Sequence, residues 1–382
     1  MQQLDRLVLR NVWLSSWVLS FSLLGDALLY VVLPVHADAF GVSMIIVGFL
    51  LAVNRIIRIF AYGLIAHLVE RIGVKRLCLI AAATASISTF GYGWLDGVIA
   101  LTLSRMLWGL SFAALLLVTL TFAAVNPKKT GTRIGISRSV EQVGPLLAMT
   151  GGAWLATVVG PRDVFIYLGI ATIFSAFLAL MLNDKAQPDR FKKPIIRNHI
   201  FPRPDSLDLL IFWMGAGIDG VFIVLISLMW TQYLSVQMAI LVGGSILAAR
   251  RLCEMIVAPT AGIIADKLGV RIPLFITVSL AIAGFGLVGF GFLILGSIAL
   301  VLARAALGTL FPAAVVKIYP KNKVKALARN QTWRDIGAAA GPLIAGSCFG
   351  IISPELMHIL VAIAFSVTFF VFSKSTDCKL LL

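Results

Sequence analysis

The chain has 382 residues, of which 60% are hydrophobic and 13% are charged. An average soluble domain is about 45–50% apolar and about 25% charged, and the mean hydropathy here is +0.99. No soluble fold has enough interior to hide this much apolar surface, which excludes disorder, a secreted disulfide scaffold and a soluble enzyme. The net charge of +15 would suggest nucleic-acid binding in a soluble protein, but here it follows the loops of a membrane protein.

Apolar runs of about 20 residues, the length that crosses a bilayer as a helix, recur throughout the chain. The ninth and tenth runs are divided only by Gly296-Ser297. Cutting at clusters of turn and charged residues predicts spans at 11–35, 43–66, 74–95, 97–125, 134–158, 163–183, 207–233, 237–264, 272–292, 294–317, 330–351 and 355–373. The sequence therefore predicts an all-α, multi-pass membrane protein.

Lys and Arg in the predicted loops gather on the side of the two termini, while the opposite loops contain only Arg162. Cytoplasmic loops of membrane proteins are enriched in these residues, so we expect both termini in the cytoplasm. The longest loop, 184–206, is basic and separates an N-terminal bundle, 1–183, from a C-terminal one, 207–382. We interpret it as a solvated linker, with contact to anionic lipid as the alternative.

The two halves are repeats of one another. Residues 66–76, after the second span, read AHLVERIGVKR, and residues 262–271, after the eighth, read GIIADKLGVR, about 196 residues later. Other landmarks recur at nearly the same offset: Arg55 with Arg250, Arg105-x3-Gly109 with Arg304-x3-Gly308, Arg133-x4-Arg138 with Arg329-x4-Arg334, and Gly144-Pro145 with Gly341-Pro342. Parallel repeats imply a pseudo-twofold axis along the membrane normal, with a solute site where the halves meet.

With these motifs the chain resembles the major facilitator superfamily over nearly its whole length. Residues 262–271 match the family's loop signature Gly-x-x-x-Asp-Arg/Lys-x-Gly-x-Arg/Lys, whereas Ala66 and Glu70 replace its Gly and Asp in the first copy. Arg105 with Gly109 resembles a motif of proton-linked drug and metabolite exporters, including siderophore exporters. The glycine-rich Gly-Pro motif typical of antiporters is matched only loosely by the fifth span and better by the eleventh.

The resemblance implies a fold of twelve transmembrane helices in two pseudo-symmetric six-helix halves, which rock about a solute site near the bilayer midplane. It places the protein in a bacterial inner membrane, with spans one, four, seven and ten lining the cavity. The sequence contains no nucleophile–base constellation, metal cluster or nucleotide motif. We therefore expect neither an enzyme nor a cofactor, and we expect a monomer.

Charges inside the predicted spans indicate function, because each costs at least about 2.5–3.5 kcal/mol near the bilayer centre. The arginines there are Arg55, Arg58, Arg105, Arg138, Arg250, Arg251, Arg304 and Arg334. The acids are Asp26, Glu141, Asp219, Glu254 and Asp335. The excess of arginine favours an anionic solute, since guanidinium binds carboxylate and phosphate bidentately.

Asp26 and Asp219 lie near the middle of spans that, by the resemblance, line the cavity. Such a carboxyl can load and release a proton during a transport cycle, or it can simply neutralise a structural arginine. Arg250 and Glu254, four residues apart, are expected to pair. We assign substrate binding or coupling to Asp26, Arg55, Arg58, Arg105, Asp219, Arg250, Glu254 and Arg304.

A second set of charges lies toward the expected cytoplasmic ends. An acid there can pair with a base or sit at the positive N-terminus of a neighbouring helix, and so latch that side shut. Arg138 and Glu141 are spaced to pair locally, whereas the adjacent Arg334 and Asp335 are expected to pair elsewhere. We assign the gate to Glu70, Arg71, Arg138, Glu141, Asp266, Lys267, Arg334 and Asp335.

The sequence therefore predicts a proton-coupled secondary transporter of a small organic anion, such as an organic acid or a carboxylate siderophore, with export favoured. One alternative is an anion uptake or exchange carrier without proton coupling. Another is a lipid-handling or sensor protein built on the same fold. The expected partners are the solute, protons and membrane lipid, and not nucleic acid.

Overall fold

The computed structural model describes residues 2–126, 129–183, 203–348 and 350–381. Their packing defines two compact units: unit 1 holds residues 2–126 and 139–183, and unit 2 holds residues 129–138 and 203–381. The start of α5 (Thr130–Glu141) thus packs with unit 2 although it precedes the predicted boundary. The predicted linker, 184–206, falls almost wholly outside the described residues.

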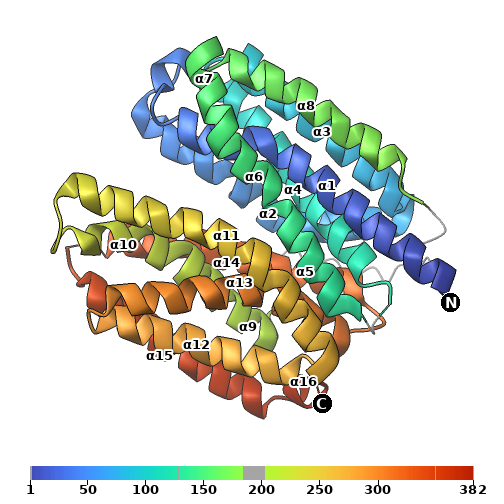
Figure 1. The fold of residues 1–382 in the computed structure, drawn as a ribbon, viewed down its shortest axis with the longest axis vertical. Coiled ribbons are helices and arrows are strands. Elements are labelled where there is room, and N and C mark those ends of the chain that lie inside the picture. Colours follow the sequence, from blue (N-terminus) through green and yellow to red (C-terminus); the bar gives the residue numbers. More distant parts are fainter. Residues whose placement is uncertain (1, 127–128, 184–202, 349, 382) are drawn as a thin grey trace. The chain divides into compact units, whose positions relative to one another are not determined.

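Unit 1 contains the first half of the predicted spans. Its helices are α1 (Gln2–Val32), η1 (Ala37–Phe40), α2 (Met44–Ile72), α3 (Val74–Trp94), α4 (Val98–Ala123), the end of α5, α6 (Val143–Leu147), η3 (Ala148–Gly152), α7 (Ala153–Val159) and α8 (Asp163–Leu180). Within unit 1, the end of α5, α6, η3 and α7 belong to one candidate membrane span. Helix α4 packs against α1, α2 and α3, and α3 packs against α8 (Figure 1).

Unit 2 repeats this packing pattern. Its helices are α9 (Ser206–Trp213), η5 (Met214–Phe222), α10 (Ile223–Trp230), α11 (Val236–Leu268), α12 (Arg271–Gly289), α13 (Leu293–Ile318), α14 (Lys323–Ser347), α15 (Pro354–Lys374) and α16 (Thr376–Lys379). Helix α13 packs against α11 and α12, and α12 against α15, as α4 packs against α2 and α3, and α3 against α8. The internal repeat of the sequence is therefore also a repeat of helix contacts.

The helices present apolar side chains outward. Ten helical segments among the described residues are long and apolar enough to cross a membrane. The other two predicted spans form α11 and α14, which carry more charge within the helix. Leu343 and Ile256 are 71% and 69% exposed, which suits contact with lipid rather than water. The all-α, twelve-helix fold expected from the sequence is confirmed.

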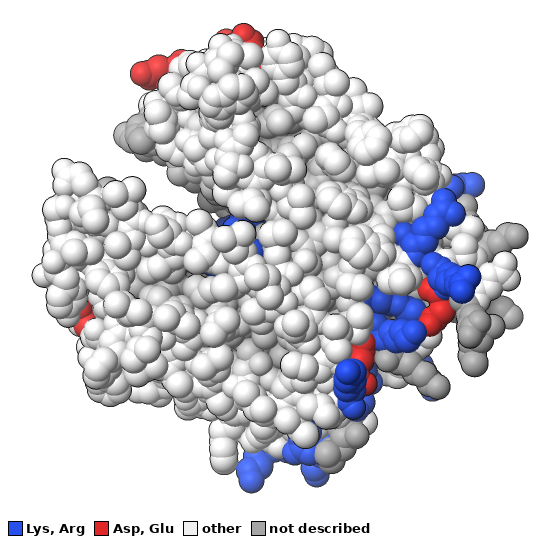
Figure 2. Space-filling model, viewed as in Figure 1, with Lys and Arg blue, Asp and Glu red and all other residues white. Residues whose placement is uncertain are grey.

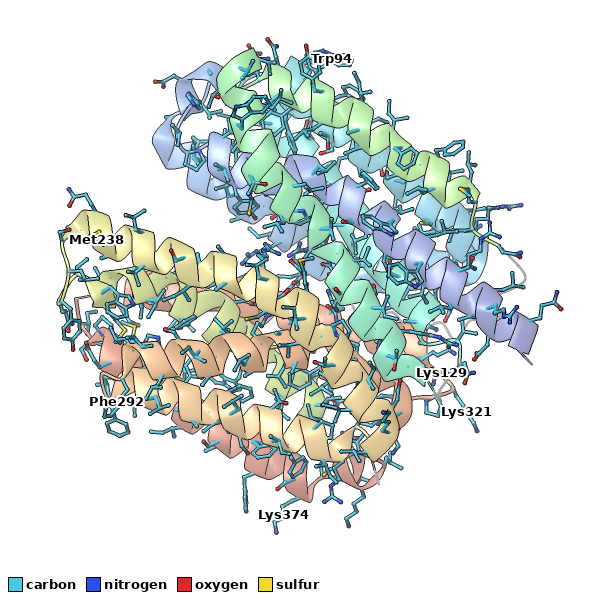
Figure 3. All side chains as sticks on the ribbon, viewed as in Figure 1. Trp94, Lys129, Met238, Phe292, Lys321 and Lys374 are labelled. Carbon is cyan, nitrogen blue, oxygen red and sulfur yellow. The ribbon has the colours of Figure 1, made fainter. Side chains whose placement is uncertain are left out.

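Exposed charged residues are sparse on the face drawn in Figure 2. Most of that face is neither acidic nor basic, and most of the visible Lys and Arg lie in patches at its margin. Within unit 2, Figure 3 shows Met238 and Phe292 at one end and Lys321 at the opposite end. The loops of unit 2 therefore alternate as the Lys and Arg pattern predicts, and their assignment to a side of the membrane stays a prediction.

The break between the ninth and tenth spans lies within a few residues of the predicted bounds, 292 and 294, and not at the Gly296-Ser297 pair that divides the apolar runs in the sequence. Helix α12 ends at Gly289 and α13 begins at Leu293, so Gly296 lies within α13. The break occurs at Gly291, whose φ of 86° is readily adopted only by glycine. Gly296 instead lets the helices approach, since a Cβ there would lie 2.5 Å from Cγ2 of Val288.

Glycine also sets the approach of α14 to the rod formed by α9, η5 and α10. A Cβ at Gly341 would lie 2.2 Å from the carbonyl oxygen of Ala216, and one at Gly337 would lie 2.1 Å from that of Phe212. Small residues allow helix backbones to meet in this way within a membrane. By contrast, a Cβ at Gly346, on the same helix, would meet nothing within 4 Å.

Gly341→Ala should therefore destabilise the protein by about 1–3 kcal/mol, because the added methyl overpacks a backbone contact. Gly346→Ala is the matched control and should be neutral or stabilising by up to about 1 kcal/mol, since alanine favours a helix. Thermal unfolding of the purified variants in detergent measures both. Equal unfolding temperatures for the two variants would contradict the close contact.

Candidate functional site

The carboxylate of Asp26 in α1 and the guanidinium of Arg105 in α4 form an ion pair inside unit 1. The side chain of Arg105 is 1% exposed and that of Asp26 is 13% exposed, so the acid is the more accessible member. Nδ2 of Asn54 donates to the same carboxylate oxygen over 3.4 Å. A buried arginine in an apolar bundle needs a counter-charge, and Asp26 supplies it to Arg105.

The backbone of α2 also holds Arg105. Its Nε donates to the carbonyl oxygen of Leu50 over 2.9 Å, and its Nη2 to the hydroxyl of Tyr30 over 3.4 Å. Gly109, one turn along α4, permits this approach, since a Cβ there would lie 2.6 Å from the carbonyl oxygen of Asn54. The Arg-x3-Gly spacing thus has a local explanation: Gly109 brings α2 close, and Arg105 binds the backbone that it meets.

Unit 2 has a larger charge network at the place that the repeat relates to this pair. Asp219 of η5 accepts from Arg304 of α13 over 2.7 Å and pairs with Arg250 of α11 over 2.8 Å. Glu254 pairs with Arg250 over 3.2 Å and with Arg304 over 3.7 Å. Two acids and two arginines therefore form a ring of alternating charge, here called the unit 2 ring. Its side chains are 7–14% exposed.

Asp219 lies in a π-helical stretch, a wider helix that often occurs at functional positions. Two glycines of η5 face α14: a Cβ at Gly215 would lie 2.4 Å from the carbonyl oxygen of Arg334, and one at Gly220 would lie 2.6 Å from Cα of Gly341. Helix α1, which carries Asp26, is α-helical over its described length. The two aspartates therefore occupy different backbone environments despite the repeat.

Arg55 and Arg58 lie on α2 near Asn54, but their surroundings differ. The guanidinium of Arg58 lies 4.6 Å from the centre of the Phe112 ring of α4, and Arg58 is 8% exposed. Phe112 lies two turns along α4 from Arg105. Arg55 is half-buried. Arg58 of α2 thus contacts α4, the helix that carries the buried arginine of the ion pair.

Asp266, in the signature loop, lies at the N-terminus of α5, and both groups belong to unit 2. Its Oδ1 accepts from the N–H of Gly131 over 2.8 Å, and its Oδ2 from the N–H of Thr132 over 2.7 Å. The first N–H groups of a helix have no partner within it, and the positive end of the dipole favours an anion. Gly131 permits this contact, because a Cβ there would lie 2.5 Å from the carbonyl oxygen of Gly262.

Three other gate residues lie at helix ends. Lys267, next to Asp266, is exposed. In unit 1, Glu70 and Arg71 lie in the last turn of α2, at the positions that the repeat relates to Asp266 and Lys267. Glu70 is half-buried and Arg71 is exposed. The acid of each copy is therefore less exposed than the base that follows it.

Arg334 and Asp335 pair with each other, contrary to the expectation that these neighbours pair elsewhere. Nη2 of Arg334 donates to Oδ1 of Asp335 over 2.8 Å, and Nε donates to it over 3.2 Å. Adjacent helical residues point about 100° apart, but the arginine side chain is long enough to reach back across that angle. Arg138 and Glu141 of α5 are also buried, with 8% and 7% exposure.

One ionic cluster in unit 2 was not foreseen from the sequence. Arg329 of α14 pairs with Asp205, and with Asp208 over 2.5 Å, while Nδ2 of Asn330 donates to Asp208 over 3.1 Å. The hydroxyl of Tyr319 donates to Asp205 over 2.7 Å. Burial raises the pKa of this phenol above its ordinary value. The cluster joins the start of α9 to the end of α13 and to α14.

Part of this cluster had a signal in the sequence. Asp205 accepts from the N–H of Asp208 over 2.7 Å, and Asp208 accepts from the N–H of Asp205 over 3.2 Å, which makes a capping box at the start of α9. An acid three residues after a capping residue, just before an apolar run, is typical of a helix start. Arg329 lies 124 residues beyond Asp205 and had no such signal. Within the described ranges, no group of three His, Cys, Asp or Glu could hold a metal ion.

Asp219→Asn should destabilise unit 2, because it leaves two arginines with one acid, and breaking a buried ion pair costs about 3–5 kcal/mol. Adding Arg304→Gln restores the balance of charge. The double variant should therefore be more stable than the sum of the two single changes predicts, by about 1–3 kcal/mol. Thermal unfolding of the three variants measures this coupling, and strictly additive effects would contradict the unit 2 ring.

Asp266→Asn should loosen the start of α5. The neutral amide has one acceptor oxygen and no charge, so one of the two N–H groups loses its partner. Hydrogen–deuterium exchange in the peptide 129–138 should become about tenfold faster, as expected for loss of a charged hydrogen bond. Lys267→Gln removes the neighbouring charge and should leave exchange unchanged. Unaltered exchange in Asp266→Asn would show that the carboxylate does not hold α5.

Residues 16–249 match the family model described as Major Facilitator Superfamily. A search among curated proteins finds no match to the chain. Among solved structures, the human organic anion transporter MFSD10 (TETRAN) is similar with a TM-score of 0.75 and 16% identity, over 94% of this chain and 98% of that one.

Two further solved structures are similar over nearly the whole chain. The proton:xylose symporter XylE, bound to 6-bromo-6-deoxy-D-glucose, has a TM-score of 0.73 and 15% identity, over 97% of this chain and 95% of that one. The E. coli fucose:proton symporter FucP has a TM-score of 0.73 and 12% identity, over 99% and 98%. At these identities the similarity shows a shared fold.

Proposed function

The chain belongs to the Major Facilitator Superfamily, and we propose that this secondary transporter carries a small organic anion together with protons. One observation carries the proposal. In unit 1, the partly exposed carboxylate of Asp26 binds Arg105, which is buried and is held by the backbone of α2. A fixed arginine, paired with an acid that a solute anion could displace, has the properties of a site that couples solute binding to proton binding.

A solute carboxylate or phosphate would compete with Asp26 for Arg105. Guanidinium binds these groups in the same geometry, so an anion that takes Arg105 displaces the Asp26 carboxylate. The displaced carboxylate would be an uncompensated charge in an apolar bundle, and protonation removes that charge. Anion binding and proton binding therefore favour each other, and the coupling is reciprocal.

This linkage makes the proton and the anion travel in the same direction. The sequence motifs favour export, and Arg105 with Gly109 supports proton-driven export as a second candidate function. Export in exchange for protons requires a solute that competes with the proton for Asp26 itself. An uncharged or cationic compound could bind Asp26 in this way. Cotransport thus suits an anion, whereas exchange suits a solute without negative charge.

The names of the structural neighbours are compatible with this proposal: one is an organic anion transporter and two are proton symporters. Because they share only 12–16% identity with the chain, the anionic class of solute rests on the chemistry of Arg105. The fold is one of transport, and we propose that it works by alternating access as a monomer in a bacterial inner membrane, with both termini cytoplasmic.

The other predicted site residues take supporting roles in this proposal. The unit 2 ring already balances Asp219 and Glu254 against two arginines, so it offers a solute no unmatched charge. We assign it the task of holding η5, α11 and α13 together during the cycle. Asp266 at the N-terminus of α5 serves the cytoplasmic gate, together with Glu70, Arg71, Arg138, Glu141, Lys267, Arg334 and Asp335.

Asp26→Asn should abolish accumulation of the anion driven by a proton gradient, because the amide cannot carry the proton. Exchange of labelled for unlabelled anion should persist, since Arg105 stays in place. Transport into proteoliposomes, screened over organic acids and phosphorylated metabolites, measures both activities.

Asp163→Asn is the control for this experiment, because Asp163 is an exposed acid in the first turn of α8, outside the charge clusters. It should leave both activities unchanged. Equal loss of accumulation and exchange in Asp26→Asn would count against proton coupling at Asp26 and favour a purely structural ion pair.

A further inference from the structure

Two basic residues lie at neighbouring helix ends in unit 2. Helix α12 begins at Arg271, and α15, which packs against it, ends at Lys374. The rings of Phe275 and Phe369 meet across these helices with centroids 4.8 Å apart. Arg271 lies one turn before Phe275, and Lys374 lies five residues after Phe369. The Cα atoms of Arg271 and Lys374 therefore lie roughly 6–8 Å along their helices from those of Phe275 and Phe369, at a similar height.

An aromatic ring holds each of these cations. The guanidinium of Arg271 lies 5.5 Å from the centre of the Phe275 ring, and Nζ of Lys374 lies 5.6 Å from that of Phe370. Such contacts fix a cation without neutralising its charge. Neither Arg271 nor Lys374 forms an ion pair with any described residue. In Figure 3, Lys374 projects outward from unit 2.

The acids closest in sequence are bound elsewhere. Asp266, just before α12, accepts from the first N–H groups of α5. Asp377, just after α15, accepts from the hydroxyl of Ser206 over 3.1 Å and from that of Tyr319 over 3.4 Å. The positive charge at the ends of α12 and α15 therefore remains available to a ligand.

The surface beside the two cations is apolar and exposed. Phe370 and Ile276 are each 64% exposed, and Ile272 and Val367 are each 57% exposed. On a membrane-spanning helix such side chains contact acyl chains. The two cations thus lie where the apolar faces of α12 and α15 end, at the level of lipid headgroups.

We propose that Arg271 and Lys374 bind the phosphate of an anionic phospholipid, whose acyl chains lie along α12 and α15. The charges suit a headgroup with net negative charge, and the exposed apolar side chains suit its tails. Basic sites between helices at this level of a membrane are known to select anionic lipids. This inference concerns the edge of unit 2 and does not depend on the proposed solute.

The test uses the full-length protein in detergent, titrated separately with phosphatidylglycerol, phosphatidylcholine and inorganic phosphate, with thermal stabilisation as the readout. Phosphatidylglycerol should stabilise the protein, and the other two should not. In the variant Arg271→Gln/Lys374→Gln, the affinity for phosphatidylglycerol should fall roughly thirtyfold, because each cation near the membrane surface contributes about 1 kcal/mol.

Two matched variants complete this test. Lys321→Gln/Lys323→Gln removes the same charge from another turn of unit 2 and should keep the wild-type affinity. Arg271→Lys/Lys374→Arg keeps the charge and should bind nearly as well as the wild type. Equal loss in the Lys321→Gln/Lys323→Gln control would show diffuse surface attraction and overturn the site. Stabilisation by inorganic phosphate alone would overturn the lipid as its ligand.

Discussion

A charge in the apolar interior of a membrane bundle must meet an opposite charge or a polar backbone group, and this constraint organises the whole structure. Arg105 meets it with Asp26 and with the carbonyl oxygen of Leu50. Gly109 is needed because only a glycine lets α2 come close enough to supply that carbonyl. One electrostatic requirement thus sets a side-chain pair, a backbone contact and the spacing of two helices.

The two units satisfy this constraint in different ways. Unit 1 uses a single pair with one accessible acid, whereas unit 2 closes Asp219, Arg250, Glu254 and Arg304 into a neutral ring. Displacing Asp26 breaks one ion pair, whereas displacing either acid of the unit 2 ring breaks two. Because of this difference, we propose that the proton and the anion bind in unit 1 and that the unit 2 ring serves as a scaffold. It also shows that a repeated fold need not repeat its chemistry.

Much of the fold could be predicted from the sequence because lipid imposes simple rules. Apolar runs of one length, basic loops on one side and recurring motifs lead directly to twelve helices in two halves. Helix α14 remains predictable despite Arg334 and Asp335, since the repeat relates it to the fifth span. The predicted bounds of the ninth and tenth spans, 292 and 294, lie close to the observed break at Gly291, whereas Gly296, which interrupts the same apolar run, instead packs against Val288 within a helix.

The sequence indicates which charges lie inside the helices, but not which of them pair across helices. The Arg250–Glu254 pair follows from helical spacing, and the position of Asp266 at a helix N-terminus follows from the signature loop. The pairing of Arg105 with Asp26 depends on how α4 crosses α1, which no local pattern encodes. Arg329 with Asp205 is a contact of the same kind, made across 124 residues.

We propose that an anion and Asp26 compete for Arg105, so that anion binding loads a proton. The most direct measurement is the pH change of a weakly buffered solution of the purified protein when a binding organic anion is added. The wild-type protein should take up protons, and Asp26→Asn should take up none. Release of protons by the wild type on binding, or equal uptake in the two proteins, would contradict competition between the anion and Asp26.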